Sequence, residues 1–320
     1  MVNNEKNEWI KFRVGKLRKW SNDCVQLINV SHVSHINNAL NIFEAEKINA
    51  GLVFDESILN NERISVVWLS PNDWTGAGGF RYGNVRFNFE WKQIINNKNY
   101  YWIESIAYGI QACRILVTSN DYSLKFKVYD PKRGDGPWWY NIDTDTHYWN
   151  GEYCLEIMIE RDVFINEALT IDFVDHHPKR CNISYADCHD LGLYRARAGA
   201  RFIAALINRG NDSNINKFIK YHPNIIEEHI LTSSISILWQ DLDYGGFVGD
   251  IKSTDEVALP ISRAVLNSYA IQNYEEMDQL CSLFKSKEDL KTSCAQLIGK
   301  SLNISDWTIL VDPLRRKYTS

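Results

Sequence analysis

The first half of the chain alternates hydrophobic and polar residues with a period of two, the pattern of half-buried β-strands. One stretch, residues 36–52, instead repeats its apolar residues every three to four positions, with Ile36, Leu40 and Phe43 near one face, and predicts an amphipathic helix. Residues 104–118 are apolar enough to fit either a helix or a strand. We expect strands at residues 24–35, 64–71, 81–91, 125–131, 152–162 and 168–174.

After residue 180 the pattern changes to a helical one. Helices are expected within residues 193–210, 215–242, 256–285 and 287–302. The sequence therefore predicts an α+β domain over residues 1–178 and a mostly helical domain over residues 179–320. No Pro-, Gly- or Ser-rich linker separates the two, so they could share a core.

Composition narrows the class of protein. The chain has 320 residues, a formal net charge of -5 and 45% hydrophobic residues, enough for one large or two ordinary domains. Its seven cysteines are odd in number and scattered, which argues against a disulfide framework. With no apolar stretch long enough to cross a bilayer and no apolar leader at its start, we expect a cytoplasmic protein without membrane contact.

Two histidines, His32 and His35, stand at the junction of the first expected strand and the expected helix, and Ser34 lies between them. On a strand, residues three apart point to opposite faces, so the two imidazoles are not expected to share a ligand. His32 is a candidate for binding by hydrogen bonds. A structural histidine at a strand end remains the alternative.

The strand expected at residues 152–162 carries Glu156 among apolar neighbours on both sides. A carboxylate in such a position is costly unless it is paired or lines a cleft. On the strand at residues 81–91, alternation places Tyr82 and Arg86 on one face, where they could hold a phosphate-bearing ligand or simply face solvent.

Two motifs together resemble those of ADP-ribosyltransferases, closest to the bacterial toxin branch that modifies nucleic acids. The first is HVSHINNALNIF, residues 32–43, and the second is LEIMIERDV, residues 155–163. The likeness also covers the order of elements to about residue 178 and does not extend to the helical region. It implies an ADP-ribosyltransferase-like split β-sheet core.

The resemblance implies NAD as the substrate and gives roles to particular residues. Glu156 is implied as the catalytic carboxylate, which stabilises the positive charge that develops on the ribose when nicotinamide leaves. The implied NAD-binding residues are His32, Ser34, Ser70, Arg81, Tyr82 and Arg86. Cys154 occupies the position where arginine-specific members carry Glu or Gln, which argues against arginine as the acceptor.

The function expected from the resemblance is a mono-ADP-ribosyltransferase toxin with an RNA or DNA target, in an anti-phage or toxin–antitoxin system with an antitoxin partner. A protein target or NAD glycohydrolase activity is the first alternative. An inactive module that binds NAD, ADP-ribose or a protein is the second, and an assembly protein without an NAD-sized pocket is the third. The net charge gives no general attraction to nucleic acid.

A cluster of histidines and cysteines lies between the two expected domains. His177, Cys181 and Cys188 are residue types that bind zinc, and a structural zinc ion could tie the domains together. Their spacing matches no zinc module, so we expect a turn with buried cysteines and no metal, with the zinc site as the alternative.

Overall fold

The computed structural model describes residues 25–54, 56–71, 83–96, 98–108, 110–134, 136–149, 154–173, 191–209, 228–244 and 246–312. The chain divides into two compact units. The first comprises Met1–Val33, Glu46–Asp73 and Phe87–Leu169, and the second comprises Ser34–Ala45, Trp74–Arg86 and Thr170–Ser320. The expected domain boundary at residue 178 lies outside the described residues and stays a prediction.

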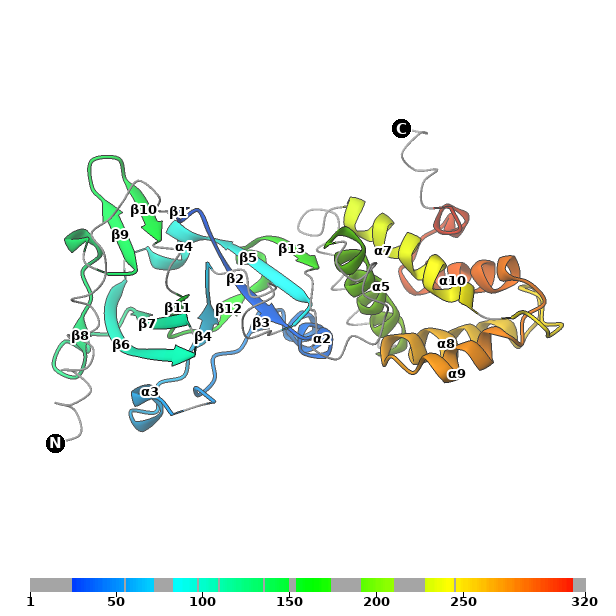
Figure 1. Cartoon of the computed structure of the whole chain (residues 1–320), viewed down its shortest axis with the longest axis horizontal. Helices are drawn as coiled ribbons and strands as arrows, with labels where there is room; N and C mark the ends of the chain where they lie inside the picture. The colour runs from blue at the N-terminus through cyan, green and yellow to red at the C-terminus, as the bar shows by residue number, and fades with distance from the viewer. Residues whose placement is uncertain are drawn as a thin grey trace. The chain divides into compact units, whose positions relative to one another are not determined.

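The prediction of a mixed α+β protein is confirmed (Figure 1). The strands are β1 (Val25–Gln26), β2 (Asn29–Ser34), β3 (Lys47–Ile48), β4 (Val67–Leu69), β5 (Val85–Glu90), β6 (Asn99–Tyr108), β7 (Ile110–Thr118), β8 (Lys127–Val128), β9 (Trp138–Asn141), β10 (Thr146–Trp149), β11 (Cys154–Ile159), β12 (Val163–Phe164) and β13 (Ala168–Phe173). The α-helices are α2 (Ile36–Ala45), α3 (Ile58–Asn61), α4 (Trp91–Ile95), α5 (Leu191–Arg209), α7 (Glu228–Asp241), α8 (Ala258–Ala270), α9 (Tyr274–Cys281) and α10 (Lys287–Ser301). Short 3-10 helices are η1 (Pro131–Arg133), η2 (Ile165–Glu167), η4 (Leu242–Tyr244) and η5 (Trp307–Leu310).

The first unit is built on a five-stranded mixed sheet with the strand order β4-β11-β7-β6-β8. β7 is the middle strand, parallel to β11 and antiparallel to β6, while β4 closes one edge antiparallel to β11. Residues 104–118, whose pattern fits either a helix or a strand, thus form most of the β6–β7 pair. Further small sheets have the orders β1-β10-β9, β12-β3 and β13-β5-β2. Boundaries between the two units fall within β2, β5 and β13.

Both faces of the five-stranded sheet carry buried apolar side chains. On β11, Leu155, Ile157 and Ile159 are buried on one face. Met158 lies on the opposite face, in an apolar cluster with Leu116 of β7 and residues of β6 and of the chain around α3. Burial on both faces explains why β7 and β11 read as nearly continuous apolar runs.

The second unit is helical over most of its described length: from residue 191 onward, every described element is an α-helix or a 3-10 helix. α5 packs against α7 and α8, and α10 packs against α8 and η5. Ser286 caps α10 by accepting a hydrogen bond from the Asp289 amide at 3.1 Å. Within the described parts of the chain, no helix combines the length and the hydropathy needed to cross a membrane.

A second core in the first unit is aromatic and surrounds the fully buried Trp138. The Trp138 ring lies edge-on to Trp91 and Tyr100, with centroids 5.0 and 4.7 Å away. Its indole Nε1–H donates a hydrogen bond of 2.9 Å to Nδ1 of His147. Because an N–H group can only donate, Nδ1 of His147 must be unprotonated, and the imidazole is neutral with its proton on Nε2.

Burial, aided by nearby Lys92, lowers the pKa of His147 from 6.5 to about 4. In the unfolded chain this histidine regains its ordinary pKa. At pH values between the two pKa values, the unfolded chain therefore binds a proton at His147 that the folded chain does not bind. The free energy of unfolding should therefore be highest above pH 6.5 and fall as the pH drops toward about 4. The loss corresponds to about 1.4 kcal/mol for each unit of pKa difference.

Urea unfolding of the wild-type chain and of His147→Asn, each at pH 7 and pH 4.5, measures this effect. The asparagine carboxamide oxygen can still accept the indole hydrogen bond but does not titrate, so the variant should lose less stability on acidification than the wild type. Equal losses in both proteins would contradict the assignment.

Candidate active site

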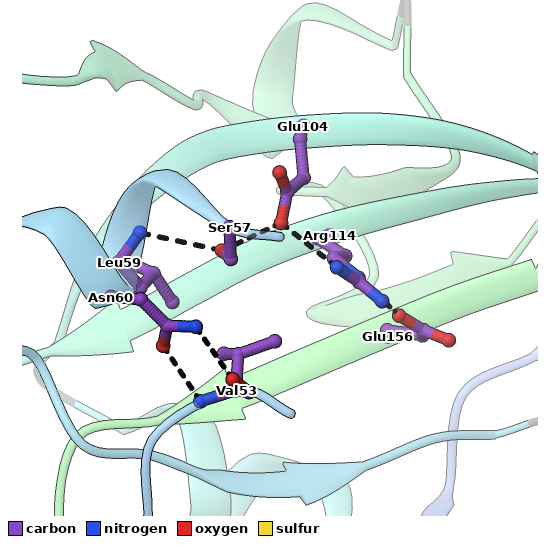
Figure 2. A network of polar contacts seen from close by, with 7 residues as sticks. All are labelled: Val53, Ser57, Leu59, Asn60, Glu104, Arg114 and Glu156. Atoms are coloured by element: carbon purple, nitrogen blue, oxygen red, sulfur yellow. Dashed lines mark hydrogen bonds and ion pairs between the residues drawn. The ribbon is translucent and has the colours of Figure 1, made fainter. Parts of the chain in front are cut away.

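Arg114 lies at the centre of the five-stranded sheet with a glutamate on each side. The strand register pairs Arg114 of β7 with Glu156 of β11 and with Glu104 of β6. Nε of Arg114 donates to Oε2 of Glu156 at 2.7 Å, and Nη1 donates to Oε1 of Glu104 at 2.9 Å. One guanidinium therefore joins three neighbouring strands through their side chains, as Figure 2 shows.

A β-bulge places Glu104 in this row. The register between β6 and β7 shifts between Trp102, which pairs with Ile115, and Glu104, which pairs with Arg114, so that Ile103 is the extra residue. A regular ladder would have paired Ile103 with Arg114 and turned Glu104 toward the opposite face. The bulge thus brings a second carboxylate to the face that already carries Arg114.

The row of charges is almost completely removed from water. The side chains of Arg114, Glu156 and Glu104 are 2%, 6% and 12% exposed. At this depth the cost of desolvation is recovered only where the ions have close partners in good geometry. Trp68 of β4 adds to the enclosure, because the guanidinium carbon of Arg114 lies 4.7 Å from the centroid of its ring.

The short helix α3 closes over Glu104. Ser57 donates a hydrogen bond of 2.7 Å from Oγ to Oε1 of Glu104, and the same oxygen caps α3 by accepting from the Leu59 amide (Figure 2). The Asn60 side chain makes two hydrogen bonds to the backbone of Val53, at 2.9 and 2.6 Å. These hydrogen bonds hold the chain around α3 against the face of the sheet that carries the charges.

Ser70 links β2, which carries His32, to β11, which carries Glu156. Its backbone exchanges two hydrogen bonds of 2.9 Å with Ser31 of β2. Its hydroxyl donates to the carbonyl oxygen of Leu155 at 2.7 Å, next to Glu156 in β11. The structure thus brings the strands of His32 and Glu156 to either side of Ser70, a proximity that the two sequence motifs do not reveal by themselves.

His32 has a defined tautomer. Its Nδ1 lies 2.9 Å from the carbonyl oxygen of Trp68, and since a carbonyl only accepts, Nδ1 carries the proton. Burial lowers the pKa of His32, an effect partly offset by that hydrogen bond. The imidazole is therefore neutral at pH 7, and its Nε2 has a lone pair with which to accept a hydrogen bond.

Two further expected site residues, Ser34 and Arg86, lie in segments of the second unit. Ser34 is buried, and its carbonyl oxygen accepts a hydrogen bond from the Asn84 amide at 3.0 Å. Gly83 approaches so closely, with φ of 149°, that a β-carbon there would lie 2.0 Å from the Ser34 carbonyl carbon. Arg86 makes a bidentate ion pair with Asp172, with hydrogen bonds of 3.0 and 2.7 Å.

Arg81 and Tyr82 lie outside the described residues, as do His177, Cys181 and Cys188 of the candidate zinc cluster. Within the described ranges, no group of three or more His, Cys, Asp or Glu side chains is placed to hold a metal ion.

Arg114, Glu104 and Ser57 are residues of the site that sequence reasoning missed. The available signal was one charge inside each of two apolar runs, Glu104 in YWIESIAY and Arg114 in QACRILVT. Opposite charges at such positions indicate a buried cross-strand pair once both runs are taken as strands. The ambiguity of residues 104–118 concealed that signal.

Comparison with known proteins adds no relative: no protein-family model, no curated protein and no solved structure matches the chain.

Replacing Arg114 by methionine should be strongly destabilising, because it leaves two buried carboxylates without their cation. The expected loss in the free energy of unfolding is about 3–5 kcal/mol. Lys125→Met is the matched control, since the Lys125–Glu62 ion pair is 54% and 33% exposed and should contribute at most about 1 kcal/mol. Urea unfolding at pH 7 measures both, and equal losses would show that the buried row contributes no more than a surface pair.

Proposed function

We propose that the chain is an NAD-dependent mono-ADP-ribosyltransferase with Glu156 as its catalytic carboxylate. The observation that carries the proposal is the bonding around Ser70, which joins the strand of His32 to the strand of Glu156. These are the two strands whose motifs resemble the toxin branch of the ADP-ribosyltransferases. The ADP-ribosyltransferase-like core belongs to the same proposal.

The charges around Glu156 suit the chemistry of NAD cleavage. As the bond between ribose C1′ and the nicotinamide nitrogen breaks, nicotinamide takes the bonding electrons and positive charge develops on the ribose. Glu104, Arg114 and Glu156 together hold two carboxylates to one guanidinium in a site that excludes most water. A negative carboxylate fixed in such surroundings stabilises a developing cation better than it would in water.

His32 and the remaining residues are assigned to binding. With its proton on Nδ1 and its ring neutral, His32 can accept a hydrogen bond from a ribose hydroxyl of NAD through Nε2. Ser70 completes the proposed contacts within the first unit, and Ser34 and Tyr82 keep the NAD-binding role that the resemblance implies. Asp172 already holds two guanidinium nitrogens of Arg86, so we assign the principal phosphate contact to Arg81.

The proposed acceptor is a nucleic acid, RNA or DNA, and the proposed setting is that of a cytoplasmic toxin held in check by an antitoxin. Both rest on the resemblance of residues 32–43 and 155–163 to toxins that modify nucleic acids, including those that act on messenger RNA in phage defence. A protein acceptor or plain NAD hydrolysis would use the same carboxylate.

A second candidate function is favoured by one specific observation. The Glu156 side chain is only 6% exposed and bonded to Arg114, which is also how a purely structural carboxylate is held. If Glu156 only stabilises the sheet, the chain would act as a binding module for NAD, ADP-ribose or a protein partner.

Labelling with radioactive NAD separates the two functions. The purified chain is incubated with labelled NAD and, separately, DNA, RNA or cell-lysate protein, and transfer of label is measured for the wild type, Glu156→Gln and Glu160→Gln. Loss of the Glu156 charge should lower transfer on the order of 100-fold. Glu160 is the matched control, because it lies just beyond β11 and its carboxylate binds Thr118, Asn120 and Tyr122 rather than Arg114.

Label on one acceptor class that disappears in Glu156→Gln and persists in Glu160→Gln would support the transferase and name its substrate. Release of nicotinamide without labelling would make the enzyme a hydrolase. Binding of NAD with no turnover in any protein would leave the binding module. Circular dichroism of both variants guards against loss of activity through unfolding.

A further inference from the structure

A pocket with a volume of about 640 Å³ lies in the second unit, lined by α7, by α10 and by the chain from η5 onward (Figure 1 labels both helices). Ligand pockets in proteins measure roughly 300–1,000 Å³, so this one can hold a molecule with several functional groups. None of its lining residues, which all lie within residues 236–312, is among those proposed to bind NAD.

Two indole rings contribute to the walls, and both are held in place. Nε1 of Trp239 donates a hydrogen bond of 2.7 Å to the carbonyl oxygen of Leu310, which joins α7 to η5. Trp307 packs directly against Gly299 of α10, where an added β-carbon would lie 2.3 Å from Cβ of Trp307. The glycine therefore permits a close approach that seats the second indole, and the pocket offers a fixed aromatic lining.

The charged lining residues have unequal environments. Lys287 is already ion-paired with Asp243. Lys291, one helical turn further along α10, has no ion-pair partner in the part of the chain that the structure describes. Glu288 and Asp312 bring carboxylates to the same lining, and Thr292 brings a hydroxyl. Among the residues that the structure describes, the lining thus sets the ammonium group of Lys291 beside groups that accept hydrogen bonds.

We propose that this pocket binds a mononucleotide. A nucleobase has a planar face for the indole of Trp307, beside the almost fully buried Trp239, and its phosphate suits the ammonium group of Lys291. The carboxylates of Glu288 and Asp312 accept hydrogen bonds from ribose hydroxyls or exocyclic amino groups. Each kind of lining group therefore has a counterpart in one ligand class.

Simpler ligands match the lining less well. An inorganic anion would leave the aromatic walls unused. A purely apolar ligand would bury the charges of Lys291 and Glu288 without offering either a polar contact, which is costly. A nucleoside without phosphate would leave the ammonium group of Lys291 unpaired.

Isothermal titration calorimetry of the full chain tests the proposal. AMP, GMP, CMP and UMP are titrated separately into the wild-type chain, with adenosine and inorganic phosphate as partial ligands. None of these ligands carries nicotinamide, so no turnover at the proposed NAD site enters the measurement. We expect at least one mononucleotide to bind, with its affinity lowered about tenfold by Lys291→Ala and largely restored by Lys291→Arg.

Lys300→Ala is the matched control, since Lys300 is an exposed lysine in the last turn of the same helix and does not line the pocket. It should leave the affinity unchanged. The proposal would be overturned if no mononucleotide binds, if Lys291→Ala and Lys300→Ala bind equally well, or if phosphate alone binds as tightly as the nucleotide. Each outcome is independent of whether the chain transfers ADP-ribose.

Discussion

The first unit depends on the buried pairing of Arg114 with Glu104 and Glu156. The backbone ladder already joins β6, β7 and β11, but a guanidinium at the middle strand makes the side chains of all three strands interdependent. Because the row is nearly inaccessible to water, each ion is tolerable only while the others are in place. This constraint fixes the strand register and, with it, the positions of Trp68 and α3, which contact the same charges.

The same contacts serve Glu156 both as part of the core and in its proposed catalytic role. A carboxylate held by a buried arginine is fixed in orientation, which electrostatic catalysis requires, and it is also part of the core. His32 shows the same combination: its hydrogen bond to the Trp68 carbonyl both anchors β2 beside β4 and determines which ring nitrogen can meet a ligand. Under the proposed function, single residues of this unit both stabilise the fold and prepare the chemistry.

Much of the fold could be predicted from local patterns, and the parts that could not depend on pairing between distant strands. The helix at Ile36–Ala45 and the strand at Cys154–Ile159 follow from apolar periodicity, because each has a clear buried face. The β6–β7 pair is buried on both faces, so its sequence lacks the alternation that distinguishes a strand from a helix. For the site, the sequence marks Glu156 as unusual but cannot name Arg114 as its partner, since their register is set by the whole sheet.

The bulge at Ile103 changes the kind of mutation that matters for this site. Substitutions alter one side chain at a time, whereas a single inserted codon in β6 reverses the facing of every residue that follows it in the strand. An acidic residue of one face is thereby carried to the face that holds the arginine, with no change in its identity. In this protein the length of the strand, as well as its sequence, therefore decides which face carries the glutamate.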